Sequence, residues 1–481
     1  PCDPGSHEVM KMTVIGCGYL GATHAACMAE LGHDVLGVDV DAAKTAALAA
    51  GETPFFEPGL DDVLRRNIAA GRLRFTTDTA EAARLARVHF LCVGTPQQPT
   101  SGAADLTALR TAVRALVGHL RGHHLVVGKS TVPVGTCAEL DDEIAALTRD
   151  ADVELAWNPE FLREGFAVDD TLHPDRIVVG TRQCPGSDAA ETLAEVYRVI
   201  LDEPTPYLTM DRATAELVKV SANAFLATKI SFINAISEMC EATGADVTAL
   251  ADAIGHDPRI GRRFLNAGLG FGGGCLPKDI RAFAARADDL GVGSVLGLLR
   301  EVDEINMRRR DALVALVERA CDGSVLGRNI AVLGAAFKPE SDDVRDSPAL
   351  AVAARLSLSG ARVSVFDPKA MHNAARAFPT LRYAESAAAA ARGAEVVIVA
   401  TEWAEFVHMP PVELSDLVAR RLIVDARRCL DGTAWADAGW DYRVLGSQSV
   451  PGPYIRTGAA FGRDKTDATA QNRAGIASLL A

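Results

Sequence analysis

Short apolar runs alternate with helix-length segments over the first two hundred residues and again after residue 329. Runs of this length, each followed by a helical segment, are typical of strands that crossover helices bury on both faces. We therefore expect an α/β protein with two Rossmann-like, doubly wound domains. The predicted strands lie at 12–15, 35–38, 88–93, 125–129, 153–157 and 176–180 in the first half, and at 330–333, 362–366, 396–400 and 422–424 in the second.

Between these halves the pattern is helical. No turn signal interrupts residues 211–243, and a second helical stretch covers about 292–321. The first stretch places apolar side chains, such as Phe225, Phe232 and Ile236, on nearly every face. A helix that is apolar all round lies inside a domain or a subunit interface. The pattern thus predicts a central all-helical domain that pairs subunits.

Prolines at 204 and 206 break the first α/β pattern, and the alternation resumes at Asn329. We predict a first Rossmann domain at 9–205, a central helical domain at 206–325 and a second Rossmann-like domain at 326–446. From 447 to 481 no clear periodicity remains, which favours a C-terminal tail.

Composition narrows the functional classes. The chain has 481 residues, 48% of them hydrophobic, and a formal net charge of −14. Such acidity argues against a nucleic-acid or membrane-surface partner, and no apolar run reaches the roughly 18 residues of a membrane span. The ten cysteines form no C-x-x-C pair, and no leader-like segment is recognised, so we expect reduced thiols and a cytoplasmic protein. For His119, His123 and His124 we expect a solvated turn rather than a metal site, and no metal is predicted.

The first predicted turn has the spacing of a dinucleotide fingerprint. Gly16, Gly18 and Gly21 follow a strand and open a helix, and the next strand ends at Asp39. In that context the glycines bring a pyrophosphate close to the helix N-terminus. Asp39 can bind both ribose hydroxyls and would repel a 2′-phosphate, which favours NAD over NADP.

A second glycine-rich stretch, residues 268–274, ends in a chemically distinctive group. Cys275 follows it directly, with Lys278 three residues on and Asp279 four on. A nearby ammonium lowers the pKa of a thiol and raises its reactivity, and an aspartate can take a proton or orient water. The alternative interpretation is a buried free cysteine in a loop.

Lys219 and Asn223 lie four residues apart on the long helix and therefore share one face. A lysine in a mostly apolar helix is costly to bury, and burial lowers its pKa toward a catalytic range. The alternative is a lysine that extends to solvent at the edge of the helix.

Together these motifs resemble those of the UDP-glucose/GDP-mannose dehydrogenase family. The resemblance covers about residues 11–432 and rests on motifs in the family's order. They are the fingerprint, Val93-Gly94-Thr95-Pro96, Ser130-Thr131-Val132-Pro133, Asn158-Pro159-Glu160-Phe161-Leu162, the Lys219 and Asn223 pair, the glycine–cysteine loop, and Phe337-Lys338.

The resemblance implies a four-electron oxidation, in which the C6 alcohol of a nucleotide sugar becomes a carboxylate and two NAD are consumed. Cys275 would form a thiohemiacetal and then a thioester. By similarity, Lys219, Asp279 and a water remove the first proton, Glu160 and Thr131 activate the hydrolytic water, and Lys219 with Asn223 stabilises the oxyanion.

The resemblance also implies the binding residues. For the cofactor they are Gly16, Gly18, Tyr19, Leu20, Gly21, Asp39, Lys44, Thr95, Thr131, Glu164, Lys278 and Arg345. For the sugar nucleotide they are Glu160, Phe161, Leu162, Lys219, Asn223, Arg259, Phe264, Phe271, Gly272, Phe337 and Lys338. Arg259 is expected to complete the site of a neighbouring subunit, which implies a homodimer or a higher homo-oligomer.

Departures from the family pattern leave open which nucleotide base the substrate carries. Gly274 stands where serine is usual, Asn266 where many members have lysine, and Leu276 replaces a common phenylalanine. UDP-glucose is the expected substrate, with dTDP-glucose or GDP-mannose as alternatives. Two other functions stay open: a two-electron hydroxyacid dehydrogenase, and a nucleotide-sugar-binding regulator without catalysis.

Overall fold

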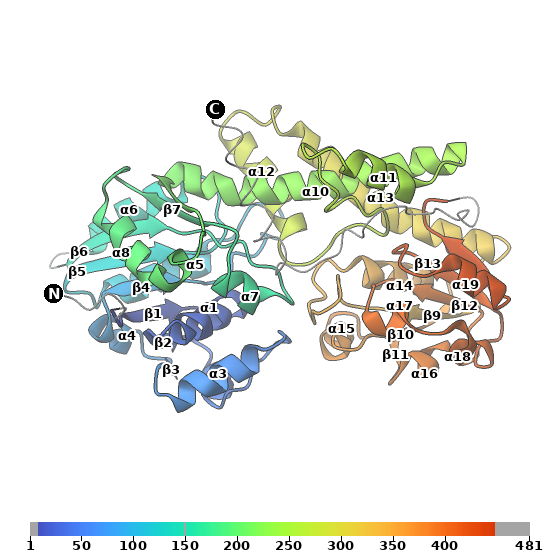
Figure 1. Cartoon of the computed structure of the whole chain (residues 1–481), viewed down its shortest axis with the longest axis horizontal. Coiled ribbons are helices and arrows are strands. Elements are labelled where there is room, and N and C mark those ends of the chain that lie inside the picture. Colours follow the sequence, from blue (N-terminus) through green and yellow to red (C-terminus); the bar gives the residue numbers. More distant parts are fainter. Residues whose placement is uncertain (1–7, 149–150, 448–481) are drawn as a thin grey trace.

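The structure is a computed structural model that describes residues 8–148 and 151–447. Two sheet domains lie at its ends and helices bridge them (Figure 1). The α/β fold class predicted from the sequence is confirmed. The predicted tail at 447–481 lies outside the described residues, apart from Ser447.

The first sheet has the strand order β3-β2-β1-β4-β5-β6-β7-β8. Its strands are parallel except where β6 meets β7 at Trp157 and Gly180. The strands are β1 (Lys11–Ile15), β2 (Asp34–Val38), β3 (Leu73–Thr76), β4 (Val88–Leu91), β5 (Gly122–Gly128), β6 (Ala151–Trp157), β7 (Ile177–Thr181) and β8 (Tyr207–Asp211). The accompanying helices are α1 (Tyr19–Glu30), α2 (Ala42–Ala49), α3 (Leu60–Ala69), α4 (Thr79–Leu85), α5 (Thr107–Val117), α6 (Thr136–Leu147), α7 (Ala167–Leu172), α8 (Asp188–Val196) and α9 (Arg198–Leu201).

This sheet extends past the expected boundary at residue 205. The prolines there do interrupt the chain, but Tyr207–Asp211 then pairs in parallel with β7 as β8. Asp211, at the end of β8, caps α10 by accepting a hydrogen bond from the Thr214 amide. Strand and long helix are therefore joined without a linker.

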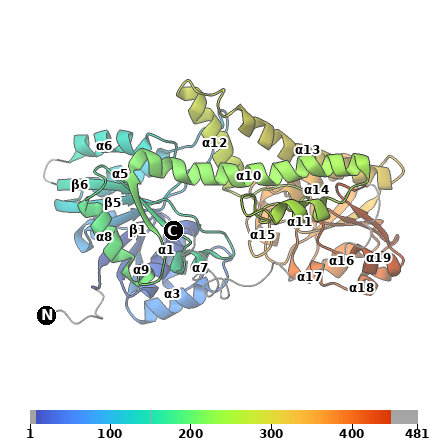
Figure 2. The same cartoon turned by 45° about the horizontal axis from the view of Figure 1, so that its top comes forward.

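The middle of the chain is helical, as predicted. It consists of α10 (Arg212–Thr243), α11 (Val247–Gly255), α12 (Leu276–Asp289) and α13 (Gly297–Ala320). Figure 2 shows α10 as one long rod that begins beside the first sheet and extends over the second domain. Contrary to its apolar pattern, α10 is not buried all round, because Phe225, Phe232 and Met239 are exposed.

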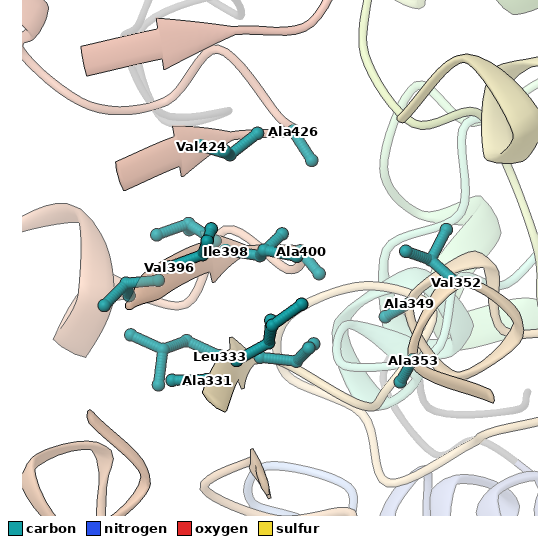
Figure 3. Packing of buried hydrophobic residues seen from close by; sticks show 14 of the residues in the cluster. Ala331, Leu333, Ala349, Val352, Ala353, Val396, Ile398, Ala400, Val424 and Ala426 are labelled. Carbon is teal, nitrogen blue, oxygen red and sulfur yellow. The ribbon is translucent and has the colours of Figure 1, made fainter. Parts of the chain in front are cut away.

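The second sheet has the order β11-β10-β9-β12-β13-β14 and is parallel throughout its described pairings. Its strands are β9 (Asn329–Leu333), β10 (Arg362–Phe366), β11 (Arg382–Tyr383), β12 (Val396–Val399), β13 (Leu422–Asp425) and β14 (Asp441–Val444). Its helices are α14 (Pro348–Leu358), α15 (Met371–Ala377), α16 (Ala387–Ala391), α17 (Ala404–Val407), α18 (Pro411–Ser415) and α19 (Gly432–Asp437). Figure 3 shows small and branched side chains, such as Leu333, Val352 and Ile398, that pack between this sheet and α14.

The histidine prediction needs a correction. His123 and His124 lie in β5, not in a solvated turn, and His124 is fully buried. His119 is exposed in the turn after α5, as predicted, and His123 is exposed beside Asp152. The sequence hid the strand because His123 and His124 open it ahead of its apolar run. Among the described residues, no helix is long and apolar enough to cross a membrane.

Candidate active site

The fingerprint turn between β1 and α1 is shaped to admit a pyrophosphate. Gly16 has φ +89°, and a Cβ there would lie 2.7 Å from Val93 Cγ1. A Cβ at Gly21 would lie 1.8 Å from the Gly16 carbonyl oxygen, so the start of α1 can approach the turn only with glycine there. Gly18, the N-cap, makes no side-chain cap, which leaves the first amides of α1 available to an anion. The turn therefore fits the diphosphate of NAD.

Asp39, at the end of β2, is buried at the edge of this turn. Its Oδ2 accepts hydrogen bonds from the Cys17 amide at 2.8 Å and from Lys44 Nζ at 2.9 Å, while Oδ1 accepts one from the Asp41 amide at 3.0 Å. The carboxylate thus ties the fingerprint turn to the start of α2. This geometry suits a ribose, and the negative charge disfavours a 2′-phosphate.

The glycine loop before α12 is the point where the three parts of the chain meet. The Gly273 amide donates to the Arg345 carbonyl at 2.8 Å, and the Gly274 amide donates to Asp343 Oδ2 at 3.2 Å. A Cβ at Gly273 would lie 2.8 Å from the Phe337 ring. The loop after β9 therefore fits against the glycine loop, and Cys275 follows at the start of α12.

Four predicted catalytic side chains form two linked pairs near Cys275. Lys219 Nζ lies 3.4 Å from Glu160 Oε1, which joins α10 to the loop after β6. Asn223 Nδ2 donates to Asp279 Oδ2 at 2.7 Å, which joins α10 to α12. The remaining residue of the set, Thr131, follows β5 and lines a small cavity together with Asp279.

Lys219 differs from its prediction in one respect. Burial alone would lower its pKa, but Glu160, Cys275 and Asp279 favour its charged form, and the net shift raises the pKa above its ordinary value. Lys219 is therefore a cation in this site. The expected shift toward a neutral amine is wrong because three acidic groups surround the ammonium.

Cys275 also departs from expectation. Its side chain is partly accessible to solvent, yet the surrounding protein raises the pKa of the thiol to about 11, and nearby carboxylates add to this. Lys219 opposes the shift. Lys278, which the sequence suggested as the activating ammonium, instead lies 2.6 Å from Asp279 Oδ1. The cation that favours the thiolate thus comes from α10.

Glu164 lies at the contact between the first and last domains. Arg345 Nη2 lies 3.3 Å from its Oε1, and Ser341 Oγ donates to its Oε2 at 2.8 Å. Burial, with help from Asp343, raises the pKa of Glu164 to about 7. Lys338 donates to the Glu164 carbonyl oxygen, so this predicted substrate ligand points toward the first domain.

A pocket between the central and last domains is lined by the other half of the glycine loop. Phe264, Gly268, Gly270, Arg427, Arg428 and Cys429 are among its lining residues. Of the predicted substrate residues, Phe264 lies in this pocket. Phe271 is buried, and its backbone N–H donates to Asn306 Oδ1. Gly272 lies against the Asp346 carbonyl, where a Cβ would come 2.5 Å from the oxygen.

The remaining predicted residues lie around the two nucleotide regions. The Leu162 amide donates to Glu160 Oε2 at 2.6 Å, and the Arg176 guanidinium lies 3.8 Å from the centre of the Phe161 ring. Thr95 Oγ1 donates to the Thr131 carbonyl at 2.7 Å.

Tyr19, Leu20 and Arg259 complete the predicted cofactor and substrate residues. The Tyr19 hydroxyl donates a hydrogen bond to Glu57, and Leu20 packs on the core of the first domain. Arg259 is 87% exposed, lies beside Asp257, and does not enter this chain's own site.

Two residues that the sequence reasoning missed hold the site together. Arg427, just past β13, donates to the carbonyl oxygens of Gly270 at 2.7 Å and Phe337 at 3.2 Å. Buried Glu57 accepts hydrogen bonds from the amides of Gly165 at 2.6 Å and Ala167 at 2.7 Å. A basic residue at the carboxyl edge of the second sheet was a usable signal for Arg427, whereas nothing in the spacing pointed to Glu57.

Comparison with known families matches three domain models of one family to successive segments of the chain. The NAD binding domain of the UDP-glucose/GDP-mannose dehydrogenase family matches residues 10–201, its central domain 213–308 and its UDP binding domain 331–432. The chain belongs to the UDP-glucose/GDP-mannose dehydrogenase family. The resemblance inferred from the motifs is therefore confirmed, and the cofactor is NAD.

Curated relatives in this family cover nearly the whole chain. A UDP-glucose 6-dehydrogenase of Rhizobium meliloti is 43% identical over 91% of this chain and 99% of its own length. One from Pseudomonas aeruginosa is 38% identical over 91% and 97%. The solved UDP-glucose dehydrogenase of Pyrobaculum islandicum, at 37% identity, has a TM-score of 0.85 over 93% of this chain and 100% of that one. The chain is therefore an enzyme, a nucleotide-sugar dehydrogenase of this family.

Proposed function

We propose that this enzyme oxidises UDP-glucose to UDP-glucuronate, with two NAD consumed at one site. The observation that carries the proposal is the convergence of Cys275 with the Lys219–Glu160 and Asn223–Asp279 pairs. The names of the relatives support UDP-glucose as the substrate. NAD, bound at the fingerprint turn, supplies the acceptor for both oxidations.

In the first oxidation the C6 hydroxyl must lose a proton. Lys219 is cationic, so it stabilises the developing oxyanion, together with the Asn223 amide, rather than accepting the proton. Asp279, held by Asn223 and near Lys278, accepts the proton through a water. The product is an aldehyde that stays beside Cys275.

The second oxidation requires covalent chemistry. The thiolate of Cys275 attacks the aldehyde carbon and forms a thiohemiacetal, whose oxyanion Lys219 stabilises. Its oxidation leaves a thioester. Water activated by Glu160, with Thr131 beside it, hydrolyses the thioester and releases the carboxylate and the thiol. The covalent bond explains why the aldehyde is not released between the two steps.

The pocket that Arg427 and Arg428 line is a candidate site for the nucleotide. Its guanidinium groups suit a diphosphate, and Phe264 offers a ring to a base. We take the base to be uracil. dTDP-glucose and GDP-mannose are the alternatives, because Gly274, Asn266 and Leu276 depart from the usual pattern.

Two features support a homodimer. Phe225, Phe232 and Met239 are 66%, 49% and 62% exposed, and their spacing of seven places them on one face of α10. Exposed Arg259 belongs to the same central domain and is free of this chain's site. We propose that a second copy covers this face and that each Arg259 enters the partner's site.

Mixing two inactive variants tests the dimer. R259A lacks the arginine and C275A lacks the nucleophile, so a mixed dimer contains one site with both groups. Activity regained on mixing under conditions of subunit exchange supports the proposal. Sedimentation as a monomer, or no regained activity from exchanged subunits, contradicts it.

We also place the enzyme in the cytoplasm, because the cysteines that the structure describes are free thiols. Fractionation of the source cells, with activity recovered in the soluble cytoplasmic fraction, is the expected result. Activity recovered outside the cytoplasm would contradict this placement.

The stoichiometry of NADH separates the proposed reaction from its rivals. Two NADH per UDP-glucose support a four-electron oxidation, whereas one supports a two-electron hydroxyacid type. Binding of the sugar nucleotide without NADH formation supports a regulator. Parallel assays with dTDP-glucose and GDP-mannose, compared by kcat/KM, identify the base.

A further inference from the structure

Lys129 is a buried lysine that the proposed reaction does not use. It follows β5 directly, only 7% of it is exposed, and its ammonium lies 6.0 Å from the centre of the Phe90 ring and 5.8 Å from that of Tyr197. Within the part of the chain that the structure describes, no carboxylate comes within ion-pair distance of this ammonium. A buried cation with no ion-pair partner is costly, so its presence calls for a reason.

The contacts of Lys129 lead to the loop of Glu160. Its Nζ donates to Asn158 Oδ1 at 2.9 Å and to the Tyr197 hydroxyl at 3.3 Å. The Tyr197 hydroxyl also donates to Asn158 Oδ1, at 2.6 Å, and Asn158 Nδ2 donates to the Val178 carbonyl at 2.7 Å. Asn158, two residues before Glu160, is therefore held by Lys129 after β5, by Val178 of β7 and by Tyr197 between α8 and α9.

Hydrogen bonding alone does not account for a lysine at this position. Tyr197 already donates to the same oxygen of Asn158, and a methionine would fill similar space without a charge to desolvate. What the lysine adds is a positive charge below the carboxyl edge of the sheet. Burial lowers the pKa of Lys129 to about 8, while Cys92 and Glu160 favour its charged form.

The acidic and basic groups around Lys129 show where that charge acts. Cys92, just past β4, is itself buried, and burial holds its pKa at about 12, so it stays a neutral thiol. His24, on α1, is buried, and its pKa is lowered by burial and by Lys129, so it stays neutral. Tyr197 keeps its proton because burial raises its pKa. Glu160 is the remaining anion among the groups that interact with Lys129.

We propose that Lys129 is a positioning residue of the reaction. Its buried charge attracts the Glu160 side chain, and its hydrogen bond to Asn158 fixes the start of the loop that carries Glu160. Glu160 then presents Oε1 to Lys219 and accepts the Leu162 amide on Oε2. The inference rests on the proposed function, because Glu160 acts there on the hydrolytic water.

Three variants separate the charge from the hydrogen bonds. Lys129→Met removes both, Lys129→Gln keeps a donor for Asn158 but removes the charge, and Tyr197→Phe keeps the charge but removes the other donor. We expect kcat to fall about tenfold or more in both Lys129 variants, with the KM for UDP-glucose changed by less than about threefold. Tyr197→Phe should keep kcat within about threefold of wild type.

Stability and pH give readouts that a purely structural role would not produce. Without a desolvated charge, Lys129→Met should have a thermal midpoint equal to or above that of wild type, although it is less active. Wild-type kcat should fall as the pH rises through the lowered pKa of Lys129, about 8, and Lys129→Met should lack this basic limb because it has no charge to lose. Tyr197→Phe should leave that limb unmoved.

Wild type is assayed first, so that failure of the proposed function is seen separately as a NADH count other than two. With that count established, wild-type kcat in Lys129→Gln overturns the proposal. So does a joint loss of folded protein in both Lys129 variants, or a Tyr197→Phe variant as impaired as Lys129→Met. Loss of kcat in both Lys129 variants, with retained folding and without the basic limb in Lys129→Met, supports it.

Discussion

Acidification is expected to weaken the first sheet domain, because His89 on β4 is buried in neutral form. His89 Nδ1 lies 2.8 Å from Thr13 Oγ1, and His89 Nε2 lies 3.0 Å from His124 Nδ1. This series of hydrogen bonds ends at Arg87, whose Nη1 lies 2.7 Å from His124 Nε2. Since the guanidinium can only donate, His124 Nε2 accepts, and one consistent set of neutral tautomers runs from Arg87 to Thr13. In this tautomer set a proton added to His89 Nε2 would face the Nδ1–H of His124, whose Nε2 also lies 3.0 Å from the Arg121 carbonyl oxygen.

The magnitude follows from the shift in pKa. Burial lowers the pKa of His89 from 6.5 to about 3, with further lowering by His124 and Arg87. The unfolded chain therefore binds more protons than the folded one between these values, and stability is complete above pH 6.5 and lost as the pH falls. From about pH 7.5 to about pH 5.5 the loss from His89 alone is about 1.4 kcal/mol of unfolding free energy.

Hydrogen exchange of the β4 amides, corrected for intrinsic rates at each pH, measures this loss within the sheet itself. His24 and His124, whose pKa values are also lowered, add to it in the same direction. His89→Asn should be less stable at neutral pH but show a pH dependence reduced by about 1.4 kcal/mol over the same range. The matched control is exposed His408→Asn, which should retain the wild-type dependence. An unchanged slope in His89→Asn would refute the reasoning.

Three further predictions concern the two nucleotide regions and the loop between them. Asp39→Ala should raise the NADP-to-NAD ratio of kcat/KM about tenfold or more, because it removes the repelling charge and releases Lys44. Asp41→Asn, two residues on at the N-cap of α2, should leave the ratio unchanged. Asp346→Asn should lower the free energy of unfolding, measured by urea titration, by about 1–3 kcal/mol and should lower kcat, because it removes the ion pairs to Arg281 and Arg310. Asparagine is chosen because it tolerates the φ of +49° at this position. Cys275→Ser should bind UDP-glucose but form no uronate by chromatography, and full uronate production by this variant would exclude the thioester.

Much of the fold could be predicted from the sequence because the strands are buried on both faces. Runs such as 330–333 and 396–400 have no polar face, and only a sheet covered on both sides uses such segments. β8 was missed because none of its residues is fully buried and they follow a proline, so nothing but pairing with β7 identifies them as a strand.

The candidate site could be predicted as a set of residues but not as an electrostatic arrangement. Spacing correctly placed Lys219 and Asn223 on one face of α10, and each has a partner from another element. It could not show that Lys219 stays charged, because the carboxylates that decide this come from Glu160 and Asp279, distant in sequence. Lys129 was hidden for a similar reason, since its significance lies in the absence of an ion-pair partner among its described neighbours.

The central claim is that one site oxidises the same carbon twice through Cys275. The most direct measurement is a single assay that counts NADH formed per UDP-glucose consumed and, in the same sample, quantifies UDP-glucuronate and free aldehyde. The account predicts two NADH per sugar, one uronate and no free aldehyde. One NADH per sugar, with the aldehyde released, would contradict it.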